Sequence, residues 1–237
     1  MPPAPTGRFH RDCQQCELRM RGMFCNLNAE TLLNYESIGT QSAYRKGVKL
    51  FEEETPCTGV FVLCTGRVKL SCTSREGKTL LLRIAVPGDV LGLGAVISGS
   101  RYEVTAETLE PTSLKSIRRD EFLAFLNRYG DASLRSAQAL SKEYRSAFFD
   151  ARRLALSDSA AGRLAGVLLD WGKAASIGKA EMRFAMALTH EELANLIGTS
   201  RETVTRVLGR FKKENLIRIN GSSVLIVNSS KLEQMAA

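Results

Sequence analysis

The first half of the chain carries short apolar runs that are broken by turn signals at close, regular intervals. Between Val48 and Ile117 the runs cover residues 60–63, 67–73, 79–86 and 102–108. Within the second run, Val68, Leu70 and Cys72 alternate with polar residues, which is the period of a strand with one buried face. Such punctuation is typical of an antiparallel barrel or sandwich.

The pattern changes to a helical period after Ile117, with amphipathic helices predicted at 120–127, 131–156 and 160–171, the last ended by Gly172. In the second helix the apolar residues recur at spacings of three and four, at Leu134, Ala137, Leu140, Tyr144, Ala147 or Phe148, Ala151 and Leu154. A stripe of this length suits a coiled coil between two chains. A helix packed on its own barrel would show the same pattern, so the sequence leaves both interpretations open.

A helix start is encoded at Thr189, whose hydroxyl and the carboxylate of Glu192 form a capping box. The helix that begins there is expected to bury Leu193, Leu196 and Ile197. Gly198 then supplies the tight turn that a helix-turn-helix has between its two helices. Thr199 and Glu202 are read as a second capping box, and the second helix is expected to bury Val204, Val207, Leu208 and Phe211.

Polar side chains on this second helix point away from its apolar stripe. Arg201, Glu202, Thr205 and Arg206 lie in its first two turns, where a recognition helix meets base edges in the major groove. Arginine can bond guanine with both arms of its fork, and glutamate can accept from cytosine. Further along the helix come Arg210, Lys212 and Lys213, which suit phosphate contacts.

A hairpin is predicted directly after the second helix. Residues 216–219 and 224–227 flank the dipeptide Asn220-Gly221, which is a strong signal for a two-residue turn. The whole segment is therefore interpreted as a winged helix-turn-helix. The predicted fold class is α+β, divided into an N-terminal cysteine-containing segment, a sensory β-barrel, a long helical region and the winged helix-turn-helix, at residues 1–27, 28–118, 119–156 and 157–237.

The charge and composition favour a soluble protein with an acidic partner. The net charge of the 237 residues is +8, and six Lys and Arg side chains face two acids between Arg201 and Arg218. No apolar run approaches the length of a membrane helix, so no membrane partner is expected. Residues 1–12 do not resemble a secretory signal, which predicts a cytoplasmic location.

This order of features resembles the CRP/FNR family of dimeric bacterial regulators along the whole chain. The matching segments are Gly66-Arg67-Val68, Pro87-Gly88-Asp89 and Gly92 in the barrel, the helix at 131–156, and Gly198 to Arg206, which includes Thr199 and Ser200. The resemblance implies a homodimer on a palindromic site in double-stranded DNA, and a contact with RNA polymerase. The combination of Arg201, Glu202 and Arg206 is similar to members that read a TGTGA-type half-site.

The cyclic AMP site of that family is not reproduced in this chain. Members that bind cyclic AMP carry Gly-Glu after the Gly-Asp turn and an Arg-Ser-Ala type segment, whereas here Leu93 follows Gly92, and Tyr102 and Glu103 follow Arg101. Leucine cannot accept from a ribose hydroxyl, and a glutamate would repel phosphate. A cyclic-nucleotide-responsive regulator is therefore kept only as an alternative, beside one that responds to another small ligand.

The N-terminal cysteines suggest a different effector. Cys13 and Cys16 are separated by two residues and Cys25 follows, and thiolates are the usual ligands of iron-sulfur clusters. The FNR subgroup senses oxygen or nitric oxide with such a cluster and a distant fourth cysteine, but here the gap before Cys25 is longer and residues 112–115 contain no cysteine. The remaining options for completing a site are Cys57, Cys64, a group other than cysteine, or a zinc ion in place of the cluster. A thiol redox switch, and cysteines without any chemistry, also stay open.

Two other classes of protein are weighed. Barrels of this kind resemble metal-binding cupin enzymes, but such sites need histidines inside the barrel, and the two histidines are His10 and His190. The sequence therefore predicts no enzyme. A module that uses the helix-turn-helix for protein contacts is the other alternative, and a steep salt dependence of DNA binding would argue against it.

Overall fold

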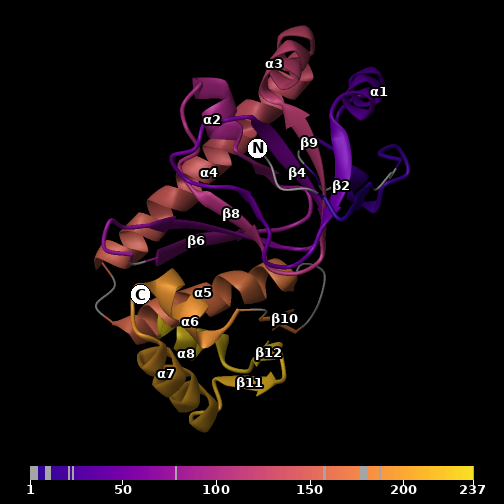
Figure 1. The fold of residues 1–237 in the computed structure, drawn as a ribbon. Helices are drawn as coiled ribbons and strands as arrows, with labels where there is room; N and C mark the ends of the chain where they lie inside the picture. Colours follow the sequence, from indigo (N-terminus) through magenta and orange to yellow (C-terminus); the bar gives the residue numbers. More distant parts are fainter. Residues whose placement is uncertain are drawn as a thin grey trace. The chain divides into compact units, whose positions relative to one another are not determined.

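The computed structural model describes residues 5–8, 12–20, 22, 24–77, 79–156, 159–176, 181–186 and 188–236. The chain folds into two compact units, Met1–Ser146 and Ala147–Ala237 (Figure 1). Within the described ranges, no helix combines the length and the apolar character needed to span a membrane. The finer division into four segments stays a prediction.

Two antiparallel sheets form the N-terminal unit. The first has the order β1-β2-β9-β4-β7, with β1 (Gly7–Arg8), β2 (Thr40–Tyr44), β9 (Thr112–Arg118), β4 (Gly59–Thr65) and β7 (Val90–Leu91). The second has the order β3-β8-β5-β6, with β3 (Lys49–Phe51), β8 (Thr105–Thr108), β5 (Val68–Thr73) and β6 (Thr79–Ala85). Leu63 and Leu114 of the first sheet and Leu70 of the second meet in one core between them. The predicted antiparallel N-terminal domain is confirmed.

Helices cover the outer face of the first sheet. They are η1 (Glu17–Met20), α1 (Ala29–Ser37), α2 (Leu93–Ser98), α3 (Arg119–Arg128) and α4 (Gly130–Leu156), so the helices predicted at 120–127 and 131–156 are confirmed. Strand β4 is buried on both faces, which explains its continuous apolar run. Val60 and Val62 pack among side chains of α1 and α3, and Phe61 and Leu63 enter the core between the sheets.

Strand β5 departs from the predicted alternation. A bulge shifts its pairing register between Leu70 and Ser71. The prediction that Cys72 shares the buried face of Val68 and Leu70 is wrong. The extra residue at this bulge is Leu82 on β6, and beyond it Ser71 is the buried side chain of β5 while Cys72 is half-buried.

Helix α4 packs on the barrel along one face. Ala132 and Ala139 are buried in the cluster outside the first sheet, and Leu140 packs against it. Ser136, on the same face, is also buried and donates to the carbonyl of Ala132. The assignment of Leu140 to an intermolecular stripe is therefore wrong, since its side chain already has a partner surface in its own chain.

The opposite face of α4 is exposed and largely apolar. Leu134 is 60 % exposed, Tyr144 72 % and Phe148 59 %, and Ala137 and Ser141 between them are exposed as well. These five residues, here called the exposed stripe, repeat at spacings of three and four, which is the pattern of a coiled-coil interface. The interpretation as a helix packed on its own chain is confirmed for one face, and the coiled-coil interpretation stays a prediction for the other. The side chain of Leu154 lies outside the described part.

The C-terminal unit combines helices with a small antiparallel sheet. Its elements are α5 (Ala160–Ala175), β10 (Arg183–Ala185), α6 (His190–Ile197), α7 (Arg201–Lys213), β11 (Ile217–Asn220), β12 (Ser223–Ile226) and α8 (Ser229–Ala236). Helix α5 continues past Gly172, so the predicted end there is wrong. A Cβ at Gly172 would lie 2.6 Å from Cδ1 of Ile226, so this glycine permits close packing of α5 on β12 instead of ending the helix.

Candidate nucleic-acid interface and cysteine site

The start of α6 follows the sequence prediction closely. The amide of Glu192 donates to the hydroxyl of Thr189, and the carboxylate of Glu192 accepts from the amide of Thr189 at 2.9 Å. Both halves of the capping box are therefore present. Gly198 closes the helix in the left-handed region at φ 63°, which allows the chain to turn sharply into α7.

The N-cap of α7 is Ser200, so the predicted capping box at Thr199 and Glu202 is wrong. Ser200 has extended backbone angles, and its hydroxyl accepts from the amide of Thr203. Glu202 is one position too early in the helix to reach back to the cap. Hydrogen bonds from its own amide and from Ser200 lower the pKa of its carboxyl, which keeps it ionised at the helix start.

The two faces of α7 divide as the sequence predicts. Val204, Val207, Leu208 and Phe211 are buried. The predicted DNA contacts are exposed at Arg201, Glu202, Thr205, Arg206, Arg210, Lys212 and Lys213, and so is Ser200, whereas Thr199 is half-buried. On α6 the buried residues are Leu193, Ala194 and Ile197, and Leu196 is half-buried, contrary to expectation.

Buried apolar side chains of α7 and hydrogen bonds from Arg163 hold the N-terminal end of α7 in place. Phe211 is fully buried. Arg163 of α5 donates from Nε to the carbonyl of Ile197 at 2.7 Å, and from its guanidinium to the carbonyl of Gly198. The arginine thus satisfies the carbonyls at the end of α6, directly at the turn between the two helices. Sequence reasoning missed Arg163, because nothing local links it to a turn more than thirty residues away.

Thr205 is tied to its neighbours within the unit. Its hydroxyl donates to the carbonyl of Arg201 and lies 2.8 Å from Nδ1 of His190. These bonds occupy the hydroxyl of Thr205 within the unit. His10, the other histidine, lies outside the described residues.

A groove of about 450 Å³ lies between α7 and the hairpin of β11 and β12, and His190, Lys212 and Ser222 are among the residues that line it. Asn220 pairs with Ser223, so the turn consists of Gly221 and Ser222, one residue later than predicted. Figure 1 shows α7 beside this hairpin, with β10 added to the sheet on the other side of β12. An exposed helix next to a projecting hairpin is the arrangement of a winged DNA-binding unit.

The cysteines of the N-terminal segment converge on the outer face of the first sheet. Cys25 is buried, and Cys13 packs against the same cluster as Tyr35. Burial raises the pKa of the Cys25 thiol to about 12, and nearby Cys64, Cys16 and Cys13 raise it further in that order. Cys64 sits at a bulge of β4, between Leu63 and Thr65, which re-aims its side chain. Cys64 is thus one of the thiols that act electrostatically on Cys25, whereas Cys57 packs against the same cluster as Cys13.

This group fits a metal or cluster in its chemistry but is not closed around one point. Four thiols are a suitable donor set for iron-sulfur or zinc binding. Among the described residues, however, no three Cys, His, Asp or Glu side chains stand close enough to hold one ion.

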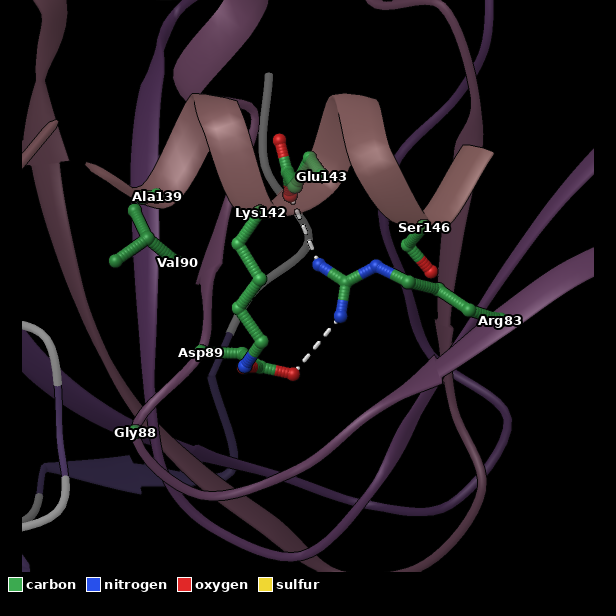
Figure 2. Close-up of a pocket in the computed structure, with 8 residues that line it drawn as sticks. All are labelled: Arg83, Gly88, Asp89, Val90, Ala139, Lys142, Glu143 and Ser146. Carbon is green, nitrogen blue, oxygen red and sulfur yellow. Dashed lines mark hydrogen bonds and ion pairs between the residues drawn. The ribbon is translucent and has the colours of Figure 1, made fainter. Parts of the chain in front are cut away.

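A second hollow lies between α4 and the turn before β7, and its volume is about 70 Å³. Figure 2 shows Arg83 of β6 reaching across it, with one terminal nitrogen 2.8 Å from Asp89 and the other 2.9 Å from Glu143 of α4. Burial raises the pKa of Glu143 despite this ion pair. The space holds about two water molecules, far less than the pockets that bind small molecules.

The positions that would hold a cyclic nucleotide are engaged elsewhere. Leu93 is buried in the cluster outside the first sheet. Arg101 donates from its guanidinium to the carbonyl of Glu54, and Glu103 accepts from the hydroxyl of Ser100. The Tyr102 hydroxyl donates to the carbonyl of Gly59 at 2.7 Å, in the core of the barrel.

Two family models match separate parts of the chain. The Crp-like helix-turn-helix domain matches residues 162–235, and the cyclic nucleotide-binding domain matches residues 41–129. These ranges contain, respectively, the exposed face of α7 and most of the two sheets.

Relatives match nearly the whole chain. It is 31 % identical to a transcriptional regulator of Lacticaseibacillus casei, flp, over 90 % of this chain and 95 % of that protein. It is 29 % identical to the CRP-like cAMP-activated global transcriptional regulator of Mycobacterium tuberculosis, over 81 % of this chain and 86 % of that protein. The structure of FixK2 from Bradyrhizobium japonicum superposes with a TM-score of 0.75 at 22 % identity, covering 84 % of this chain and 98 % of that one.

Proposed function

Because the chain belongs to the CRP/FNR family of transcription regulators, we propose that it binds a palindromic DNA site as a homodimer and that its N-terminal cysteines switch this binding. The observation that carries the proposal is the exposed N-terminal end of α7, where Arg201, Glu202 and Arg206 stand opposite a fully buried stripe. These side chains can enter the major groove while the core of the unit stays intact. We further propose that the half-site is of the TGTGA type. The protein contacts RNA polymerase and acts in the cytoplasm.

The second subunit is proposed to dock on the exposed stripe of α4. Leu134, Tyr144 and Phe148 leave a row of large apolar side chains in water, which a second copy of the same helix would bury. Pairing two copies places two recognition helices on one duplex, and half-sites about one helical turn apart would match this symmetry.

The residues around the interface have separate tasks in this mechanism. Arg201 and Arg206 read guanine, and Glu202, held ionised at the helix start, accepts from cytosine. Lys212 and Lys213 contact phosphates and set the register without reading sequence. Nε of Arg210 lies 3.9 Å from Oε1 of Glu214, so part of the charge of Arg210 is already compensated within the chain.

The proposed effector site is the group of Cys13, Cys16, Cys25 and Cys64. An iron-sulfur cluster held there would supply reactivity toward oxygen or nitric oxide. The chain would contribute soft ligands, among which Cys25 is buried. In this proposal the fourth thiol comes from β4, since residues 112–115 of β9 contain no cysteine.

A titration of labelled palindromic and random duplexes tests the DNA-binding proposal. We expect Arg206→Ala to weaken binding to the cognate palindrome by about 1–3 kcal/mol and to leave random DNA nearly unaffected. Arg183→Ala, which removes an exposed arginine from β10 in the same unit, is the matched control and should change neither. Equal losses on both duplexes would refute base reading by Arg206.

Protein purified without oxygen tests the effector proposal. We expect a coloured protein with iron and labile sulfide, and loss of both in Cys64→Ser but not in Cys72→Ser, since Cys72 lies on β5. Colourless protein without iron, sulfide or zinc would leave these thiols as structural residues.

A further inference from the structure

The groove beside the recognition helix runs along one border of the exposed face of α7. Its volume is about 450 Å³, and its polar side chains include His190 at the start of α6, Thr205 and Lys212 on α7, and Ser222 in the hairpin turn. Thr205 and Lys212 are seven residues apart, so they lie about two turns apart on the same side of the helix. Thr205 follows Arg201 by one turn, and the groove therefore continues from the base-reading end of α7.

The charge inside this groove is positive. Of the described residues that line it, Lys212 carries a full charge, His190 is the other titratable group, and none is a carboxylate. Glu214, the acid nearest to Lys212 along the helix, is engaged by Arg210 and Lys231 at 3.9 and 3.6 Å. A concave surface with a cationic side chain and several hydroxyls suits an anion.

The ring of His190 is held in place by the recognition helix. Its Nδ1 lies 2.8 Å from Oγ1 of Thr205, and the hydroxyl of Thr205 donates to the carbonyl of Arg201 at 3.0 Å. No described residue bonds to Nε2, so this nitrogen is left for a ligand. A side chain that is already oriented loses little conformational freedom when it binds a partner.

Gly209 leaves one wall of the groove open. It lies inside α7, between Thr205 and Lys212, where glycine is less favourable than alanine. A Cβ at Gly209 would meet no atom within 4 Å. Packing within the chain therefore does not require a glycine here, and the bare backbone lets a bulky partner approach the helix closely.

We infer that this groove holds the sugar-phosphate backbone of one DNA strand, with His190 and Lys212 on different phosphates and a deoxyribose over Gly209. The inference rests on the proposed DNA binding and adds the path of one strand to it. When Arg201 enters the major groove, a strand must pass along the border of the same helix face. The two contacts are about two helical turns or roughly 10 Å apart, and phosphates of one strand follow every 3.4 Å or so along the duplex axis.

Charge substitutions at Gly209 test the inference by their sign, since neither side chain displaces a packed neighbour. We expect Gly209→Lys to tighten and Gly209→Glu to weaken binding to palindromic and random duplexes alike, each by at least about threefold at low salt. Gly209→Lys should also steepen the plot of log affinity against log salt concentration by about 1. Gln234→Lys and Gln234→Glu, at an exposed position of α8, are the controls and should leave slope and affinity unchanged. A Gly209 pair that behaves like the Gln234 pair would overturn the inference.

Neutral methylphosphonate linkages, placed one at a time in the palindrome, locate the phosphates that the groove contacts. We expect one linkage to weaken binding of the wild-type chain but not of His190→Ala, and a different linkage to do the same for Lys212→Ala. Arg183→Ala should keep the wild-type pattern, and the Tm of each variant shows that it is folded. If the wild-type chain ignored every palindrome, the proposed function would fail together with the inference. If it bound the palindrome but no linkage coupled to His190 or Lys212, the inference alone would fail.

Discussion

The recognition helix and the cysteine site are assembled in opposite ways. The interface on α6 and α7 is built from residues 189–213, which are nearly contiguous, and its polar groups stand in water. The proposed cysteine site takes Cys13 and Cys64 from separate segments, and Cys25 in it is buried. Local signals such as capping and helical period suffice for the first, whereas only sheet pairing and register bring the second together.

This difference determines what a substitution changes in each region. In the C-terminal unit, the exposed polar side chains of α7 can be replaced at little cost in stability, because the buried apolar side chains of the same helix hold it in place. In the N-terminal unit the polar groups that link distant elements also hold those elements, so a substitution there changes both the site and the packing.

The largest effect is expected from Phe211→Ala. Phe211 is fully buried, and its removal leaves a cavity under α7 that should cost about 3–5 kcal/mol. Urea unfolding followed by fluorescence of Trp171, the single tryptophan and part of the same unit, measures this cost. Lys212→Ala, on the exposed face next to it, is the control and should stay near wild type. A small loss for Phe211→Ala would mean that the exposed end of α7 does not depend on the core beneath it.

Arg83→Met should have the next largest effect. It leaves the carboxylates of Asp89 and Glu143 without their shared partner, and we expect a loss of about 1.5–3 kcal/mol in stability and faster amide exchange in α4. Hydrogen exchange resolved by mass spectrometry locates the change. Arg75→Met, at an exposed turn, provides the comparison. Unaltered exchange in α4 would show that this ion pair does not connect the helix to the barrel.

Ser200→Ala tests the corrected start of the recognition helix. Loss of the N-cap should cost about 1 kcal/mol, while Thr199→Ala should cost less than about half of that. Both variants are compared by urea unfolding and by affinity for the palindrome. The reverse order of the two losses would restore Thr199 as the cap.

Glu143→Gln should have the smallest effect, and its sign depends on pH. Because burial raises the pKa of Glu143 in the fold, the charged form destabilises the native state above that pKa. Wild type should gain stability relative to Glu143→Gln as the pH falls through the raised pKa toward the ordinary value of 4.5. The side chain is 38 % exposed, so the difference at pH 7 should stay below about 1 kcal/mol. Parallel stability profiles between pH 7 and 5 would contradict this assignment.

Much of the fold could be predicted where a signal repeats within a few residues. The capping box at Thr189, the turn at Gly198 and the buried side of α7 are local patterns, and the structure confirms them. The errors arise where a neighbour in space decides. Gly172 looks like a helix end but accommodates Ile226, and Leu140 fits the helical stripe but packs on the barrel.

In the candidate sites, too, the sequence predicts what local patterns specify and misses what contacts between distant residues decide. Every predicted basic residue of α7 is exposed, because a helix surface is specified by its own period. The sequence could not choose between Cys57 and Cys64, since only the packing of distant segments decides which of them acts on Cys25. Arg163 was missed for the same reason, as its partners lie at the end of another helix.

By itself, the order of residues determined the antiparallel domain, the long helix, the helix-turn-helix and the family, because each depends on periods and caps within short windows. Tertiary structure alone decided which face of α4 remains in water and which of the other cysteines acts electrostatically on Cys25. Those outcomes depend on contacts between residues far apart in the chain, and a single bulge in β4 or β6 is enough to change them.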